Sequence, residues 1–286
     1  MRGFYIAILG SLIFPLMSCQ SNSEIKNALT FYSSFDKGAN ADFALGDATI
    51  YSAEARYENS NRILDDIREG IEDTKNELIK GAGLFGNAIR FDRTGSKVVF
   101  YMGEENIAYN SQDWSGTISF WLKVDPSTEL DGYTDPIQIT DTNFNDASIW
   151  VDFTDKAPRD FRLGVFGDNE KWTRDTLNMT SREAFAKRLV TVKAAAFKGD
   201  SWTHVAIAYK HLGTSESVAS LYLNGVEQGN ISGISDPFSW ELSESKIFLG
   251  LNFNGYMDEL AIFNQSFTDQ QIMTLFQLEG GVQSIL

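Results

Sequence analysis

Short runs in which apolar and polar residues alternate recur along most of the chain, and this pattern limits the folds that it can adopt. In "GTISFWLKV" (116–124), Ile118, Phe120 and Leu122 fall on one face and polar residues on the other. Alternation with period two is typical of a β-strand that buries one face. Comparable runs occupy 28–36, 85–92, 97–102, 147–153, 202–210, 219–229, 246–252 and 255–263. Many short strands and few helices predict an all-β fold, a two-sheet antiparallel sandwich.

Three segments depart from this alternation and predict helices. Between 53 and 80, Leu64, Ile67, Ile71 and Leu78 recur at spacings of three, four and seven, which predicts an exposed amphipathic helix over 62–79, inserted between strands. The segment 174–197 is irregular, and we expect a long loop with a short helix around 181–189. "SFTDQQIMTLFQ" (266–277) has the spacing of a capping box and predicts a short C-terminal helix.

Local turn chemistry supports the series of strands. Asn224 and Gly225 separate two apolar runs, and this dipeptide is typical of a type I′ hairpin turn because both central residues need a positive φ. No repeat or low-complexity linker divides the chain. We therefore expect one large domain rather than two.

Charge excludes one class of partner. The chain of 286 residues has 24 Lys and Arg against 39 Asp and Glu, a formal net charge of -15. Such a surface repels nucleic acid, whose binding depends on cationic side chains that neutralise phosphates. The single cysteine excludes an intrachain disulfide.

The N-terminus has the features of an export signal. Arg2 precedes an apolar run from 4 to 17, which is shorter than an ordinary membrane-spanning helix and is typical of the h-region of a signal peptide. "LMSC" (16–19) resembles a bacterial lipobox, and this resemblance implies removal of residues 1–18 and acylation of Cys19. The alternative is an ordinary secretory signal with an incidental cysteine. We expect the polar residues 19–28 to form a tether and the domain to occupy 29–286.

Six segments together resemble a known superfamily. "LTFYSSFDKGANADFALGD", "FGNAIRFD", "WSGTISFWLKV", "WTHVAIAY", "LYLNGVEQG" and "GYMDELAIFNQSFTDQQIMTLF" are similar to successive blocks of a laminin G-like, concanavalin A-like jelly roll. The resemblance covers almost all of 29–278 and implies a lectin-like sandwich whose first and last strands pair. It implies fold more firmly than function, because unrelated functions share such folds.

Catalytic motifs point away from an enzyme. The β-glucan hydrolases of this superfamily carry two carboxylates on alternate positions of one strand, in a Glu-x-Asp-x-Glu run. No such run occurs here. His204 lies in "WTHVAIAY", where packing explains it better than catalysis, and two histidines with one cysteine do not make a zinc site. Hydrolysis by an unrelated carboxylate pair stays the last alternative.

The resemblance also implies a calcium site. If Leu260 and Ile262 face the core, alternation sends Asp258 inward and Glu259 outward, and an inward carboxylate needs a cation or several hydrogen bonds. In related jelly rolls, an Asp after the first strand and the Asp of the final "DE" often share a calcium ion. The matching residues are Asp36 and Asp258, and carboxylate and carbonyl oxygens suit calcium. The alternative is that Asp258 only accepts backbone hydrogen bonds.

A glycan site needs aromatic rings for stacking and polar groups for the hydroxyls. Among the tryptophans, Trp172 is the best candidate, because "FGDNEKWTRD" (166–175) has no alternation and predicts a loop. Four polar residues flank the same region and are candidate ligand contacts, with turn capping or surface ion pairs as the alternative: Asp135, Asn145, Asp146 and Arg162.

These features lead to two competing functions from different classes. The first is a non-catalytic carbohydrate-binding protein, anchored in the bacterial cell envelope through lipid on Cys19 and exposed to the periplasm or the cell surface. The second is a structural or adhesive envelope lipoprotein that binds an extracellular or envelope protein. The sequence names neither the sugar nor the partner.

Overall fold

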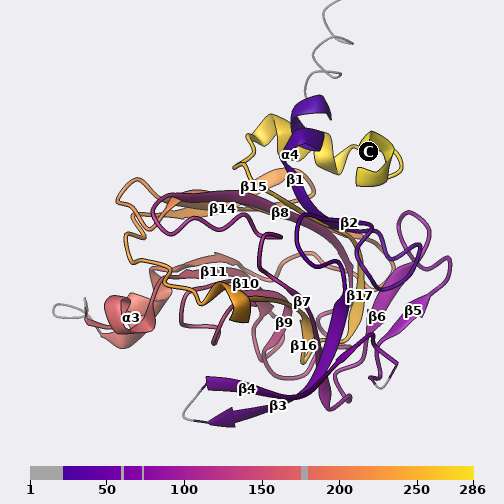
Figure 1. The fold of residues 1–286 in the computed structure, drawn as a ribbon, viewed down its shortest axis with the longest axis horizontal. Coiled ribbons are helices and arrows are strands. Elements are labelled where there is room, and N and C mark those ends of the chain that lie inside the picture. Colours follow the sequence, from indigo (N-terminus) through magenta and orange to yellow (C-terminus); the bar gives the residue numbers. More distant parts are fainter. Residues whose placement is uncertain (1–21, 59–60, 73, 175–179) are drawn as a thin grey trace, which may run out of the picture.

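Two antiparallel sheets lie face to face and form a sandwich (Figure 1). The structure is a computed structural model that describes residues 22–58, 61–72, 74–174 and 180–286. The strands of the nine-stranded sheet are β15 (Val226–Ser232), β14 (Val218–Leu223), β13 (Thr203–Leu212), β8 (Trp114–Lys123), β17 (Gly255–Phe263), β1 (Leu29–Ser33) and β2 (Phe43–Ala44), with β6 (Ala88–Phe91) beside β17 and β5 (Glu77–Ile79) beside β6. The two-sheet antiparallel sandwich predicted from the sequence is confirmed.

The eight-stranded sheet is the second layer. Its strands are, in order, β12 (Leu189–Val192), β11 (Phe161–Phe166), β10 (Ser148–Phe153), β9 (Thr134–Thr140), β16 (Lys246–Leu251), β7 (Lys97–Met102), β3 (Ile50–Glu58) and β4 (Asn61–Glu69). β1 pairs with β17, so the first and last strands of the sandwich are neighbours. Hairpins of consecutive strands, such as β9 to β12 and β13 to β15, alternate in the sheets with pairs from distant parts of the sequence, such as β8 with β17 and β9 with β16, and the fold therefore also depends on long-range pairing.

The main core fills the space between the two sheets. Ile118, Phe120 and Leu122 of β8 face Ile137 and Ile139 of β9 across this space, and all of these side chains are buried. Alternate residues of these strands leave the core, which explains the period-two pattern of the sequence. At the β14–β15 turn, Asn224 and Gly225 both have positive φ, as a type I′ turn requires.

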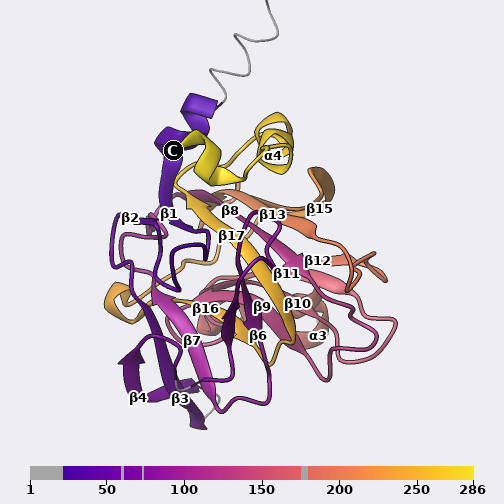
Figure 2. The same cartoon turned by 90° about the vertical axis from the view of Figure 1, so that its right-hand side faces the viewer.

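Helices cover the outer side of the nine-stranded sheet. α4 (Asp269–Phe276) begins with the expected capping box, in which the Thr268 hydroxyl accepts a hydrogen bond from the Gln271 amide. Residues 22–28 form a further helix, and its side chains Ile25 and Ala28 pack into the same apolar cluster as Ile272 of α4. Figures 1 and 2 show both helices at one end of the molecule. The folded part thus begins before Leu29, and the tether predicted over 19–28 is too long.

The exposed helix predicted over 62–79 is wrong. β4 forms a hairpin with β3 instead, with Ala55 opposite Leu64, and residues 77–79 form β5. The apolar residues have different environments: Leu64 packs on the outer face of the eight-stranded sheet, Ile71 and Leu78 pack against the main core, and Ile67 is exposed. Their helical spacing therefore arises by chance, because they belong to different structural elements.

The remaining helices are short. α3 (Ser181–Ala186) lies where the sequence predicts a short helix and has its own capping box, formed by Thr180 and Glu183. α2 (Asn169–Trp172) is a single turn, and the 3-10 helices η2 (Leu242–Glu244) and η3 (Val282–Ile285) complete the set. Among the described residues, no helix has both the length and the apolar character needed to cross a membrane.

Candidate functional site

A cavity of about 700 Å³ opens on the outer face of the eight-stranded sheet. Its walls come from the β3–β4 hairpin, from strands β9, β10 and β11, from the end of β16 and from α3. Figure 1 shows the hairpin and α3 on the side of this sheet that faces away from the other layer. The volume is within the range of small-molecule sites.

Three aromatic rings are exposed in the walls of the cavity. Tyr57, Tyr133 and Phe144 are 63%, 54% and 41% exposed. Beneath them Trp150 is buried, and its Nε1 donates a hydrogen bond to the Phe144 carbonyl oxygen at 2.6 Å. The tryptophan therefore fixes the backbone that carries one of the exposed rings. Large exposed rings in a concave wall are suited to a ligand with a flat apolar face.

An ion pair forms part of the polar floor. Asp152 and Arg162 stand opposite each other on β10 and β11, and Arg162 Nε donates to Asp152 Oδ1 at 2.8 Å while its Nη2 donates to Oδ2. The Arg162 guanidinium also lies 5.3 Å from the Tyr133 ring centroid. Burial raises the pKa of Asp152, although Arg162 opposes this change. This bidentate pair is a rigid, oriented part of the floor.

A chain of hydrogen bonds forms the rest of the floor. Arg62 Nη2 donates to Gln138 Oε1 at 2.9 Å, and Gln138 Nε2 donates to Asp135 Oδ2 at 2.6 Å. Burial and the neighbouring Asp152 raise the pKa of Asp135 to about 7. Near neutral pH, Asp135 therefore exchanges between an acceptor-only carboxylate and a carboxyl group that also donates.

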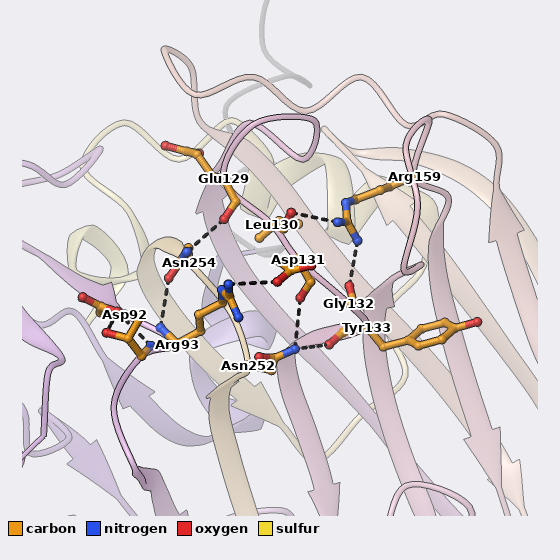
Figure 3. Close-up of polar contacts among 11 residues, drawn as sticks. Asp92, Arg93, Glu129, Leu130, Asp131, Gly132, Tyr133, Arg159, Asn252 and Asn254 are labelled. Atoms are coloured by element: carbon orange, nitrogen blue, oxygen red, sulfur yellow. Dashed lines mark hydrogen bonds and ion pairs between the residues drawn. The ribbon is translucent and has the colours of Figure 1, made fainter.

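The loop that presents Tyr133 is held by side chains from other parts of the chain (Figure 3). Arg159 is buried and donates to the carbonyl oxygens of Pro126 at 2.8 Å, Leu130 at 2.8 Å and Gly132 at 2.7 Å. Asn252 Nδ2 donates to the Tyr133 carbonyl oxygen at 2.7 Å. These bonds satisfy carbonyl groups that a loop leaves unpaired, so Tyr133 stands on a fixed backbone.

Two of the predicted ligand residues line this cavity and three do not. Asp135 and Arg162 are in its floor. Asn145 and Asp146 lie outside it and hold α2: the Asn145 carbonyl accepts from Trp172 Nε1 at 2.9 Å, and Asp146 Oδ1 accepts from the Asn169 amide at 2.7 Å. The capping alternative thus describes what Asp146 does.

The prediction that Trp172 is an exposed platform is wrong. Trp172 is only 4% exposed and packs against Phe166 and Phe185. The sequence argument failed because the absence of alternation indicates a non-strand backbone but says nothing about burial. Tyr133 and Phe144 carried a usable signal, since each is a lone aromatic residue within a polar, turn-rich stretch.

The acids near the C-terminus are arranged differently from the predicted alternation. A β-bulge in β17 places Asp258 opposite Trp121 and Ala261 opposite Ser119, so two residues, Glu259 and Leu260, face a single residue of β8. Glu259 has a φ of 55° and is 2% exposed. Glu259 lies on the outer side of the sheet, as predicted, but it is buried there, where the Tyr32 hydroxyl and the Val282 amide donate hydrogen bonds to it. The prediction that Asp258 shares the direction of Leu260 is wrong, because Asp258 is opposite Trp121, whereas Leu260 belongs to the main core.

Asp258 and Asp36 hold one loop between them. Asp258 Oδ2 accepts from the amides of Leu84 at 2.7 Å and Phe85 at 3.1 Å, and Asp36 Oδ1 accepts from the Asn87 amide at 2.7 Å. These bonds match the alternative in which Asp258 accepts from backbone groups.

One atom of Asp258 is also available to bind the predicted calcium ion. Asp258 Oδ1 is buried and has no hydrogen-bond partner in the described part of the chain. The same part contains no group of three or more His, Cys, Asp or Glu residues that could hold a metal ion. A calcium ion at Asp36 and Asp258 would therefore need carbonyl oxygens or water as its other ligands.

Comparison with known proteins identifies relatives of the whole fold. The family model of the concanavalin A-like lectin/glucanases superfamily matches residues 94–273. No protein among those with curated descriptions matches the chain.

Solved structures are similar over most of the chain at low identity. Domain 4 of an extracellular arabinanase from Geobacillus stearothermophilus, solved in complex with arabinotriose, has 16% identity and a TM-score of 0.53, and the match covers 87% of this chain and 98% of that domain. The binding domain of botulinum neurotoxin serotype G has 13% identity and a TM-score of 0.48, with 79% of this chain and 50% of that one covered. At these identities the likeness concerns the fold.

Proposed function

Since the chain belongs to the concanavalin A-like lectin/glucanases superfamily, we propose that it binds a carbohydrate in the cavity of the eight-stranded sheet without cleaving it. The observation that carries this proposal is the composition of the walls: exposed Tyr57, Tyr133 and Phe144 surround a floor of hydrogen-bonded polar side chains. Rings stack on the apolar face of a sugar, and the floor offers both donors and acceptors to its hydroxyl groups.

The state of the acids in the floor argues against hydrolysis. A glycosidase needs one carboxyl group that donates a proton and a second that acts as nucleophile or base. Asp135, with its raised pKa, has the character of the first, but Asp152 has both oxygens engaged by Arg162. A carboxylate in a bidentate ion pair is a poor nucleophile, and the geometry therefore favours binding over cleavage.

We propose that the protein acts at the bacterial cell envelope. The support is the sequence alone: the short apolar run and "LMSC" make Cys19 a substrate for lipidation. An anchored protein that binds sugars would hold a glycan close to the cell.

A glycan array tests the proposed function. The purified protein should bind defined oligosaccharides, and Tyr133→Ala should weaken binding at least tenfold while leaving the melting temperature within about 2 °C, since surface substitutions change stability little. Phe43→Ala is the matched control, because Phe43 is an exposed ring on β2 of the other sheet. It should bind like the wild type.

The array also separates the competing functions. Failure to bind any glycan, with and without calcium, would favour the structural or adhesive lipoprotein with a protein partner. Equal loss of binding in Tyr133→Ala and Phe43→Ala would place the sugar site elsewhere. Shortening of the bound oligosaccharides during incubation would support hydrolysis.

A further inference from the structure

A second, smaller hollow adjoins the cavity. Its volume is about 70 Å³, and Leu251 and Asn252, at the end of β16, line both spaces. Most of the other residues of the second hollow come from the β6–β7 connection and the start of β7, among them Arg93, Ser96 and Lys97, and the rest from β16 and from Asn76. Leu251 and Asn252 therefore form a wall between the two hollows. We call these two residues the shared wall.

A left-handed glycine and the residues after it build this shared wall. Gly250 has a φ of 66°, and a Cβ atom on it would lie 2.1 Å from the Phe91 ring, so only glycine fits there. The chain bends at this point, which brings Leu251 against the outer apolar cluster around Phe248 and leaves Asn252 exposed. Leu251 presents an apolar surface between the two hollows.

Hydrogen bonds connect the shared wall to both sides. Asn252 Nδ2 donates to the carbonyl oxygens of Asp131 at 3.2 Å and Tyr133 at 2.7 Å, and Arg93 Nη2 pairs with Asp131 Oδ2 at 2.9 Å. Figure 3 shows Asn252 between Tyr133 on one side and Arg93 on the other. Tyr133 of the cavity and Arg93 of the second hollow are thus connected through Asn252 and Asp131, which fixes their relative positions.

We propose that the ligand is a linear oligosaccharide that runs from the cavity over Leu251 and Asn252 into the second hollow. This inference rests on the proposed function and specifies its ligand class: a chain of several sugar units rather than a single sugar. The cavity takes the units that stack on Tyr133, Leu251 supports the apolar face of the following unit, and Arg93, Ser96 and Lys97 donate hydrogen bonds to hydroxyl groups of the far unit.

The test is binding as a function of chain length. The probes are immobilised arabinan, xylan, mannan and glucan oligosaccharides, each from the disaccharide to the octasaccharide. For the series that binds, the affinity should rise with length until the second hollow is filled. Each added hydrogen bond strengthens binding by roughly two- to tenfold.

Ser96→Tyr is the variant that separates the two hollows. Ser96 is exposed in the second hollow, and a tyrosine there fills the space. It should remove the gain from long chains and leave the shortest binding chain unaffected. Ser215→Tyr is the matched control, since Ser215 is exposed on the β13–β14 connection and lines neither hollow.

The outcomes distinguish the inference from the function on which it rests. Affinity that does not change with chain length, or equal weakening of short and long chains by Ser96→Tyr, would overturn the extended site and leave carbohydrate binding intact. Binding of none of the series would overturn the proposed function for these glycans, and the extended site with it.

Discussion

Asp258 is a buried acid whose environment favours its protonated form. Burial raises its pKa to about 8, and neighbouring Glu259 adds to this effect. A carboxyl group whose pKa is raised on folding contributes stability at low pH and loses it as the pH rises through the folded-state value. Without a cation, the contribution of Asp258 is therefore present below about pH 4 and declines towards pH 8.

A cation at Asp258 would reverse this behaviour above neutral pH, because it favours the ionised form. We predict that calcium stabilises the wild type by RT ln(1 + [L]/Kd), about 2.7 kcal/mol at a hundredfold excess over Kd. For a domain of this size, each kcal/mol raises the melting temperature by about 2–4 °C. Asp258→Asn should lose most of this increment, and so should Asp36→Asn. The measurement is thermal unfolding in calcium and in EDTA.

EDTA at two pH values provides the control. At pH 9 in EDTA, Asp258→Asn should be at least as stable as the wild type, because the neutral amide does not have to be ionised in a buried site. At pH 5 the difference between the two should shrink. Identical wild-type curves in calcium and in EDTA would leave Asp258 with only its backbone hydrogen bonds to Leu84 and Phe85.

Single residues differ in how well the sequence predicts their role. Asp135 and Arg162 were found because polar residues flank the central strands, and strand pairing then brings them into one floor. The direction predicted for Asp258 is wrong because a bulge adds one residue to β17, and alternation cannot reveal an added residue. Burial of Trp172 depends on α3 and its neighbours, which the local sequence around 172 does not contain.

At the level of elements, strands with one buried face were predictable and the β3–β4 hairpin was not. β8 and β13 alternate throughout, because one side faces the core. β4 is an edge strand, and most of its residues are exposed, so no buried face imposes period two on it. The charged residues that suggested an exposed helix are also typical of a protected edge strand.

This hairpin supplies one wall of the cavity, and its tip can be shortened. Tyr57 pairs with Arg62, and Glu58 with Asn61. Deleting these four residues removes Tyr57 and Arg62 from the site. The other β3–β4 pairs, from Arg56 with Ile63 onward, stay in place. The deletion removes two contacts of Arg62: its position over the Phe248 ring, at 4.3 Å from the centroid, and its hydrogen bond to the buried Gln138 side chain at 2.9 Å.

We predict that the shortened protein unfolds below the wild type by about 2–4 °C for each kcal/mol lost, where the cation–π contact contributes about 1 kcal/mol and the hydrogen bond from the charged Arg62 to Gln138 about 1.5–3 kcal/mol. Binding of the glycan found on the array should fall at least tenfold. Calorimetric titration and thermal unfolding of the same samples measure both effects. Unchanged affinity would mean that the ligand does not reach the hairpin.

At the scale of the whole molecule, the two outer faces have different roles. On the nine-stranded sheet, α4 and the helix of residues 22–28 bury an apolar cluster, and Lys26 Nζ donates to the carbonyl oxygen of the C-terminal Leu286 at 2.5 Å. The cavity lies on the opposite face of the sandwich. Figures 1 and 2 show the helix of residues 22–28 beside α4, at the end where the chain enters the fold.

This arrangement means that lipidation of Cys19 would determine which way the cavity faces relative to the membrane. Only Gln20 and Ser21 separate Cys19 from the first described residue, Asn22, and three residue steps reach at most about 10 Å. An acylated Cys19 would therefore hold the helix-covered end close to the bilayer and leave the cavity facing away from it. A form without the lipid would have no such orientation, so the proposed anchor would determine how the cavity faces a glycan.

We predict that Cys19→Ala releases the protein from membranes, because acyl chains and not the folded domain supply the apolar attachment. After fractionation of a bacterial host, wild-type protein should sediment with the envelope and take up labelled palmitate, and the variant should do neither. Ser23→Ala is a matched control, because it keeps the whole of "LMSC". Purified variant that binds the array like the wild type would show that folding and the sugar site are intact, so that loss of sedimentation reflects loss of the anchor. A variant that still sediments with membranes and still incorporates palmitate would contradict lipidation at Cys19.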